Sequence, residues 1–367
     1  MNFFKVEKWV NDGYAITYLE NKAYFIKGAI PGETIEADIN PKYPNKLILK
    51  KIVESSPKRI SSDCKIFLNC GGCSFRHLEY AEELIIKKNL LSNEIKFRLG
   101  EKNLIPISLF YKDPNHYRNN AQFKIYNSKI GFYKENSNEW IELPDSICKN
   151  ISREILESIK NFKMPNQKQI KLRTSTKGVI NYEKQVTQKF VLNKEIQIPE
   201  NGFFQINDSL LETWIIEIQK KVKSNNSLIE LFSGSGIISL FIGEKFKNYT
   251  GYELDEKAVK YARINTLNNS IPHLKFTIKN LYKEKLLEKN TDSIFTNPPR
   301  AGLGKNMIEE ILRLMPQNIY YSSCNYITLV SDLSKLIDKY TLVSLDLFDF
   351  FPRTHYFESF VVLNRKS

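Results

Sequence analysis

Five cysteines are the residues of this chain best suited to nucleophilic or metal chemistry. A thiolate is a strong nucleophile near neutral pH and also a ligand of zinc and of iron–sulfur clusters. Cys324 stands apart from the other four. It follows the apolar run Ile319–Ser323, which predicts a buried strand that presents the thiol at the carboxyl edge of a sheet. A lone cysteine is more often a small buried hydrophobic residue, so its role depends on what the chain places beside it.

The other four cysteines have the spacing of a ligand set. Cys64-x5-Cys70-Gly-Gly-Cys73 is followed much later by Cys148. Cys70 and Cys73 can reach one metal centre, because two intervening residues turn the chain back and the glycines permit the necessary backbone dihedrals. A structural zinc site usually has a second Cys-x2-Cys pair, which is missing here. The pattern therefore favours a 4Fe-4S cluster, with zinc or four incidental buried cysteines as the alternatives.

The elements that must position Cys324 begin near residue 203, where strands and helices start to alternate. Ser227–Phe232 is a predicted buried strand, followed by the turn Ser233-Gly-Ser-Gly236 and a helix from Ile237. The next strand ends at Glu253, where a carboxylate can bind both hydroxyls of a ribose. The third glycine of the dinucleotide fingerprint is absent, so a nicotinamide enzyme is disfavoured.

The same alternation continues towards Cys324. A helix is predicted over Ala258–Asn268, with Asn265 and Asn268 on its exposed edge, and a strand over Asp292–Thr296 delivers Asn297-Pro-Pro-Arg300. This order matches the α/β fold of class I S-adenosyl-L-methionine-dependent methyltransferases, a doubly wound sheet with a reversed last strand. A helix near Thr328 is expected to lower the pKa of the Cys324 thiol through its N-terminal dipole.

The first 202 residues have a different pattern. Short strand-like runs with Gly and Pro turns over residues 1–58 predict a small OB-like antiparallel β-barrel. Residues 59–202 mix helix and strand, with a helix over Tyr80–Arg98 and a hairpin around Asn127-Ser128, and form a predicted α+β central domain that carries the four cysteines. Residues 203–367 form the predicted catalytic domain.

Composition limits the class of protein. The formal net charge of +13 favours a polyanionic partner such as RNA, although a lysine-rich composition would give the same excess. No run of about 18 apolar residues predicts a membrane span, and the N-terminal residues do not resemble a signal peptide. We therefore expect a cytoplasmic protein whose cysteines are thiols or ligands rather than disulfides.

Several motifs, taken together, carry a family resemblance. Asp12-Gly-Tyr-Ala15 with Gly28-Ala-Ile-Pro-Gly-Glu33 resembles the TRAM domain, an OB-like RNA-binding barrel. With the four cysteines, the chain resembles the RNA uracil-5-methyltransferase family over nearly its whole length, most closely the 23S rRNA branch. The motifs that carry this resemblance are Phe203-Phe-Gln-Ile-Asn207, Asn297-Pro-Pro-Arg-Ala-Gly-Leu303, Ser322-Ser-Cys-Asn325 and Phe351-Pro-Arg-Thr-His-Tyr-Phe-Glu358.

The resemblance implies a role for each matching residue. Cys324 would attack C6 of uracil and Glu358 would accept the C5 proton, on a target base that has left its stack. Arg300 would hold a phosphate or the uracil carbonyl. The implied partner is RNA, either 23S rRNA or tRNA, and the protein is expected to be a monomer. The remaining implied ligands are Gln205, Phe232, Glu253 and Asn297 for S-adenosyl-L-methionine and Cys64, Cys70, Cys73 and Cys148 for the 4Fe-4S cluster.

Some positions depart from the family pattern. Asn297 stands where Asp is usual, Asn280 lies where an acidic residue is common, and Tyr356 replaces a usual His. The acidic-to-amide changes leave open a decayed methyltransferase that only binds RNA or senses redox state. An amino-group methyltransferase is the other alternative, but that class places an aromatic residue where Arg300 stands.

Overall fold

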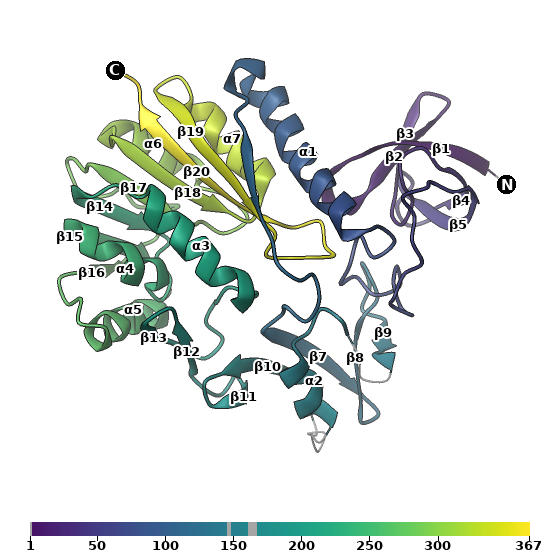
Figure 1. Cartoon of the computed structure of the whole chain (residues 1–367), viewed down its shortest axis with the longest axis horizontal. Helices are drawn as coiled ribbons and strands as arrows, with labels where there is room; N and C mark the ends of the chain where they lie inside the picture. The colour runs from purple at the N-terminus through teal and green to yellow at the C-terminus, as the bar shows by residue number, and fades with distance from the viewer. Residues whose placement is uncertain (1, 145–147, 161–166) are drawn as a thin grey trace.

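The computed structural model describes residues 2–144, 148–160 and 167–367. Three sheet-based parts are visible: a barrel at one end, a large sheet at the other, and a smaller sheet between and below them (Figure 1). No helix in these described ranges is long and apolar enough to cross a membrane.

The N-terminal part is a five-stranded antiparallel sheet that curls until its edges meet. Its strands run in the order β3-β2-β1-β4-β5, and the Phe25 N–H donates to Asn45 O at 2.9 Å to join the two edges. Alternating apolar residues, among them Phe4, Val6 and Ile35, fill its interior. The elements are β1 (Asn2–Trp9), η1 (Asn11–Gly13), β2 (Ala15–Leu19), β3 (Lys22–Ile26), β4 (Thr34–Ile39) and β5 (Leu47–Glu54).

The middle of the chain contains a second antiparallel sheet, in the order β11-β10-β7-β8-β9. Asn127 and Ser128 both have positive φ, at 47° and 59°, as a tight hairpin turn between β7 and β8 requires. Helix α2 (Arg153–Lys160) packs its buried face on this sheet. The strands are β7 (Asn120–Tyr126), β8 (Lys129–Tyr133), β9 (Trp140–Glu142), β10 (Gln169–Ser175) and β11 (Gly178–Asn181), and β12 (Thr187–Val191) pairs separately with β13 (Lys194–Ile198).

The large sheet has eight strands in the order β16-β15-β14-β17-β18-β20-β19-β6. Strands β16, β15, β14, β17 and β18 are parallel, and β20 is antiparallel to both of its neighbours, which confirms the predicted doubly wound sheet with a reversed last strand. The strands are β6 (Ile107–Phe110), β14 (Asn225–Leu231), β15 (Phe246–Glu253), β16 (Lys275–Ile278), β17 (Ser293–Thr296), β18 (Asn318–Ser323), β19 (Tyr340–Phe348) and β20 (Glu358–Arg365).

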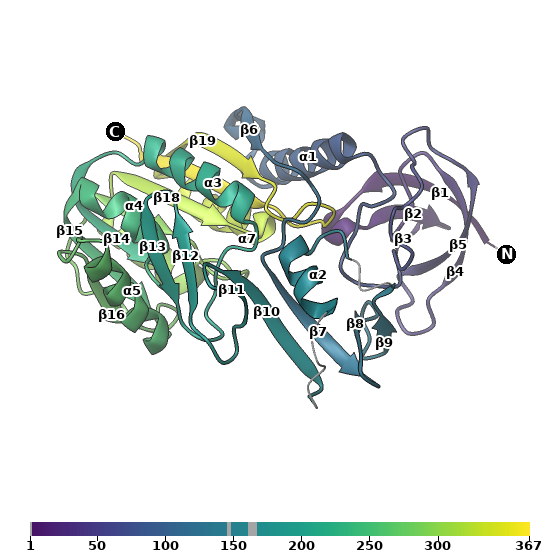
Figure 2. The same cartoon turned by 60° about the horizontal axis from the view of Figure 1, so that its bottom comes forward.

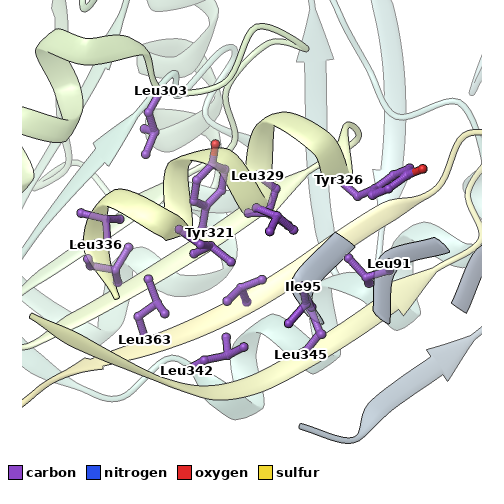
Figure 3. Close-up of a cluster of buried hydrophobic side chains, with 14 of the residues drawn as sticks. Leu91, Ile95, Leu303, Tyr321, Tyr326, Leu329, Leu336, Leu342, Leu345 and Leu363 are labelled. Atoms are coloured by element: carbon purple, nitrogen blue, oxygen red, sulfur yellow. The ribbon is translucent and has the colours of Figure 1, made fainter. Parts of the chain in front are cut away.

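Helices cover both faces of this sheet (Figures 1 and 2). On one face α1, α6 and α7 bury a cluster of leucines and isoleucines against Tyr321, and Figure 3 shows this cluster. On the other face α3, α4 and α5 pack around Tyr320 and Phe295. Neighbouring residues of a strand point to opposite faces, so Tyr320 and Tyr321 belong to different cores. The helical elements are α1 (Tyr80–Leu99), η2 (Glu101–Asn103), α3 (Asp208–Lys221), α4 (Ile237–Ile242), η4 (Gly243–Lys245), α5 (Glu256–Asn268), α6 (Gly304–Leu314) and α7 (Tyr326–Leu336).

Two elements from the predicted central range pack with the large sheet. Strand β6 adds to its edge beside β19, and α1 lies against α7 (Figure 2). The division of the chain into domains 1–58, 59–202 and 203–367 stays a prediction. The large sheet includes β6, which comes from the predicted central domain.

Candidate active site at the carboxyl edge of the large sheet

The parallel strands bring the predicted site residues to one edge. Phe232 follows β14, Glu253 ends β15, Asn297 follows β17 and Cys324 follows β18. Glu358 begins β20, which runs in the opposite direction, so its first residue lies at the same edge beside the end of β18. The edge thus collects five of the six residues predicted for catalysis and cofactor binding.

The sixth residue, Gln205, lies in a loop whose neighbouring residues contact this edge. It is 5% exposed and lies in the loop before α3, where Asn207 Nδ2 donates to Phe350 O at 3.5 Å. Phe350 follows the carboxyl end of β19. Asn119 Nδ2 also donates to Gln205 O at 2.7 Å, so the loop is held from two sides.

The glycine turn after β14 is bonded to the end of β15. Glu253 Oε2 accepts a hydrogen bond from Gly234 N at 3.0 Å, and Oε1 accepts from Leu254 N at 2.7 Å. Gly236 has a φ of +74°, and a Cβ there would lie 3.0 Å from Ala262 Cβ. Only glycine therefore gives this turn its close approach to α5.

Asn265 supports the same turn, and the predicted exposed position for it is wrong. Its side chain is fully buried; Nδ2 donates to Ser235 O and to Gln197 O, both at 2.9 Å, and Oδ1 accepts from Gln197 N at 2.8 Å. The polar side chain is buried because it satisfies backbone groups of the turn and of β13. Asn268, by contrast, is exposed as predicted.

Phe232 and Asn280 lie at the same edge of the sheet. Phe232 has a φ of +59° and its ring lies 5.5 Å from that of Tyr282. Asn280, after β16, accepts a hydrogen bond from Tyr282 N at 3.1 Å. Tyr282 is not among the predicted site residues. Its position two residues after Asn280 is the one sequence feature that could have identified it.

Cys324 is partly buried between β18 and α7. Burial raises the pKa of its thiol to about 11; the Glu358 carboxylate raises it further, while Arg300 lowers it by charge and by a hydrogen bond. The expectation that the helix start lowers this pKa is therefore wrong, because desolvation of the thiolate outweighs the favourable contributions. Helix α7 begins at Tyr326, and the Asn325 side chain caps it by accepting from Ile327 N at 3.2 Å.

Glu358 is buried, at 2% exposed. Burial raises the pKa of its carboxyl to about 8, and a hydrogen bond donated by Ser322 Oγ at 2.5 Å opposes this rise. A carboxyl with a pKa near neutrality is suited to exchange a proton during a reaction. Sequence reasoning gave Ser322 no role, although it lies in the Cys324 motif.

The four remaining cysteines, each partly buried, line a single cavity of about 510 Å³. Burial raises the pKa of Cys70 to about 11, and the thiols of Cys73, Cys148 and Cys64 each add to the rise. Among the described residues, no three His, Cys, Asp or Glu side chains form a group that could hold a metal ion. The structure therefore brings the four thiols around one space without showing a metal site.

Comparison with known proteins gives one family. The family model described as tRNA (Uracil-5-)-methyltransferase matches residues 148–366. A Leptospira interrogans protein named as an uncharacterized RNA methyltransferase is 37% identical over 392 residues, covering 99% of this chain and 94% of the relative. The 23S rRNA (uracil(1939)-C(5))-methyltransferase RlmD of Marinomonas posidonica is 25% identical, covering 100% of this chain and 96% of the relative.

A solved structure has the same fold over the whole chain. It is the Pyrococcus abyssi tRNA (uracil-54, C5)-methyltransferase in complex with S-adenosyl-L-homocysteine, with a TM-score of 0.77 and 22% sequence identity. The alignment covers 98% of this chain and 99% of that one.

Proposed function

Since the chain belongs to the tRNA (uracil-5-)-methyltransferase family, and is thus an S-adenosyl-L-methionine-dependent RNA methyltransferase, we propose that it methylates uracil C5 through a covalent bond between Cys324 and C6. The observation that carries this proposal is the placement of Cys324 and Glu358 on adjacent strands at one sheet edge. The glycine turn and Glu253 lie along the same edge, where ligands bind in open α/β sheets.

The chemistry requires a nucleophile and a base. The Cys324 thiolate adds to C6, and the electron pair displaced from the C5–C6 double bond makes C5 nucleophilic. S-adenosyl-L-methionine, when bound, supplies the methyl group that C5 takes. The Glu358 carboxylate then removes the C5 proton, the double bond forms again, and the thiolate leaves. The thiolate is thereby regenerated, and Glu358 returns to the carboxylate when it releases the C5 proton to solvent.

Four residues are proposed to bind S-adenosyl-L-methionine. Glu253 is suited to the ribose hydroxyls because its position at the end of β15 follows the glycine turn. Phe232 offers an aromatic face beside Tyr282. Gln205 and Asn297 supply uncharged polar side chains. An amide at Asn297 lacks the charge that would attract a cationic cofactor, so we expect Asn297→Asp to bind it more tightly.

We propose that Cys64, Cys70, Cys73 and Cys148 hold a 4Fe-4S cluster. Four thiols around one cavity are a donor set that fits such a group. When bound, the cluster would join the segment 64–73 to residue 148, far apart in sequence. Iron and sulfide analysis of anaerobically purified protein tests this: we expect about four of each per chain, and a zinc-only protein would contradict the cluster.

The N-terminal barrel is proposed to be a TRAM domain that contacts RNA. Two cations lie close to its Tyr14 ring, with Lys27 Nζ at 4.8 Å and Lys46 Nζ at 4.7 Å from the ring centre. Lysines gathered at an aromatic ring can neutralise the phosphates of a bound RNA strand. The net charge of +13 has the sign that such contacts need.

The likeness to the 23S rRNA enzyme favours ribosomal RNA as the substrate, and tRNA is the alternative. The test incubates the purified protein with methyl-labelled S-adenosyl-L-methionine and separate 23S rRNA and tRNA fractions from cells that lack the gene. We expect label in 5-methyluridine of 23S rRNA. Label in tRNA alone would correct the substrate, and cofactor or RNA binding without any methyl transfer would favour the decayed, RNA-binding interpretation.

A further inference from the structure

Arg300 is the cation that faces the proposed nucleophile. The charged side chains that act on the Cys324 thiol are Glu358, from β20, and Arg300, from the loop after β17. The main chain of Arg300 is fixed to the start of α7, since its carbonyl accepts from Asn325 Nδ2 at 2.9 Å and from Thr328 Oγ1 at 3.1 Å. Its side chain is exposed to solvent, so the anchored main chain alone does not fix the guanidinium.

An aromatic ring supplies the missing constraint. The Arg300 Cζ atom lies 3.9 Å from the centre of the Tyr356 ring. At this distance the guanidinium stacks on the ring face, and the attraction opposes movement of the cation into water. Within the described part of the chain, the Tyr356 hydroxyl makes no hydrogen bond, so the ring itself is the part that Arg300 uses.

The ring is in turn held in place by its own loop. Tyr356 N donates to Thr354 Oγ1 at 3.2 Å, and the His355 ring lies 3.8 Å away. His355 Nδ1 is 3.0 Å from Ser74 Oγ, on a different part of the chain. The Phe351 ring meets Tyr356 edge-on at 6.1 Å. The Tyr356 ring under Arg300 is therefore packed by contacts within the protein itself.

We propose that Tyr356 is a positioning residue, whose ring holds the Arg300 guanidinium beside Cys324 so that a cation faces the sulfur whenever it is a thiolate. The thiolate exists twice in the cycle, when it attacks C6 and when it is expelled, and a fixed cation stabilises it both times. This inference rests on the proposed role of Cys324. The histidine usual in the family at this position offers a smaller ring.

The test measures the thiol directly rather than the methyl transfer. Alkylation of Cys324 by iodoacetamide is followed against pH in the full-length protein, with the tryptic peptide of residues 314–335 quantified by mass spectrometry. This peptide contains only one cysteine, so the other four do not interfere. Wild type is compared with Tyr356→Ala, Tyr356→Phe, Arg300→Ala and the double variant.

We expect Tyr356→Ala to slow alkylation about two- to fivefold near pH 8 and to move the midpoint to higher pH, as loss of a cation–π contact predicts. Tyr356→Phe keeps the ring and should match wild type. Arg300→Ala should be at least as slow as Tyr356→Ala, and the double variant should be no slower than Arg300→Ala, because the tyrosine acts through the arginine.

Two results would overturn the inference: alkylation of Tyr356→Ala at the wild-type rate, or effects of the two single variants that add in the double variant. If Tyr356→Ala does not fold, Tyr356→Leu keeps apolar bulk against Phe351 without a ring face, and the same expectations apply to it. Alkylation does not require methyl transfer. A Cys324→Ala protein that still methylates RNA would thus sink the proposed function while leaving the measured link between Tyr356 and the thiol intact.

Discussion

At the scale of single residues, the site is governed by two pKa shifts in the same direction. Burial raises the pKa of both Cys324 and Glu358, so at neutral pH the resting pair is mostly a thiol and a carboxylic acid. The sequence predicts that Cys324 and Glu358 meet in the site, but it does not predict the protonation state of either group. A cysteine before a helix suggests a lowered thiol pKa. Tertiary packing instead buries the Cys324 thiol behind Arg300 and β20, and this burial raises its pKa.

Glu358 makes the reaction pH-dependent in a defined direction. Its pKa of about 8 means that the carboxylate needed to remove the C5 proton is a minority form at lower pH. We expect kcat/KM for RNA to rise with pH between about 6 and 8, approaching about tenfold per unit from Glu358 and about tenfold more from ionisation of the Cys324 thiol, whose pKa is also raised. A quenched time course of 5-methyluridine formation at each pH measures this.

Ser322→Ala is the matched variant for this profile. It removes the hydrogen bond that stabilises the carboxylate, so the pKa of Glu358 should rise and the profile should move to higher pH. A flat profile below pH 8 in wild type, or a shift to lower pH in Ser322→Ala, would contradict the role of Glu358 as the base.

At the scale of elements, the parallel strands explain why much of the site was predictable. Once Ser227–Phe232, Tyr249–Glu253 and Ile319–Ser323 are identified as strands, their carboxyl ends must share an edge, which brings Phe232, Glu253 and Cys324 together. Asn265 was not predictable in this way. Its polarity suggests the exposed side of α5, and its partners are backbone atoms of β13 and of the turn, which leave no mark in the sequence.

Asn265→Ala should therefore loosen the cofactor turn. Removal of the side chain leaves Gln197 N–H and two carbonyls unsatisfied in a buried place, at a cost of about 2–4 kcal/mol of folding free energy. We expect a lower midpoint in urea and weaker binding of S-adenosyl-L-methionine by calorimetry. Asn268→Ala, on the exposed face of the same helix, should change neither; equal behaviour of the two variants would rule out the supporting role of Asn265.

At the scale of the whole molecule, the loop Asp349–Phe357, which leads to Glu358, is held by parts of the chain far from it. Lys87 of α1 is fully buried, and its Nζ lies 2.7 Å from both Glu83 Oε1 and Asp349 Oδ1. Ser74 N, next to Cys73, donates to Arg353 O at 2.7 Å. The barrel also reaches this region, because the Tyr326 hydroxyl bonds to the Asn11 side chain.

Sequence patterns could not reveal these connections. The period predicts the helix over Tyr80–Arg98, but it does not distinguish Lys87 from a solvent-exposed lysine, because the buried partner Asp349 is far away in the sequence. The strand Ile107–Phe110 is only four residues long and joins the large sheet at its edge, where no local signal specifies the partner.

Lys87→Met is expected to destabilise the protein by about 3–5 kcal/mol, because two carboxylates are left buried without their cation. Urea unfolding followed by circular dichroism measures this. The loop that leads to Glu358 should also lose order, so residual activity should fall more than the folded fraction does. Lys88→Met, one residue away and exposed, is the control; comparable stability of the two variants would show that the buried pair does not hold the loop.

The most direct test of the account is to trap the bond between Cys324 and uracil C6. RNA substrate in which 5-fluorouridine replaces uridine carries fluorine where Glu358 must remove a proton, so the adduct should persist after methyl transfer. We predict a covalent protein–RNA complex that forms only with S-adenosyl-L-methionine, maps to Cys324 by mass spectrometry and is absent in Cys324→Ala. Formation of 5-methyluridine by Cys324→Ala, or a complex mapped to another residue, would contradict the mechanism.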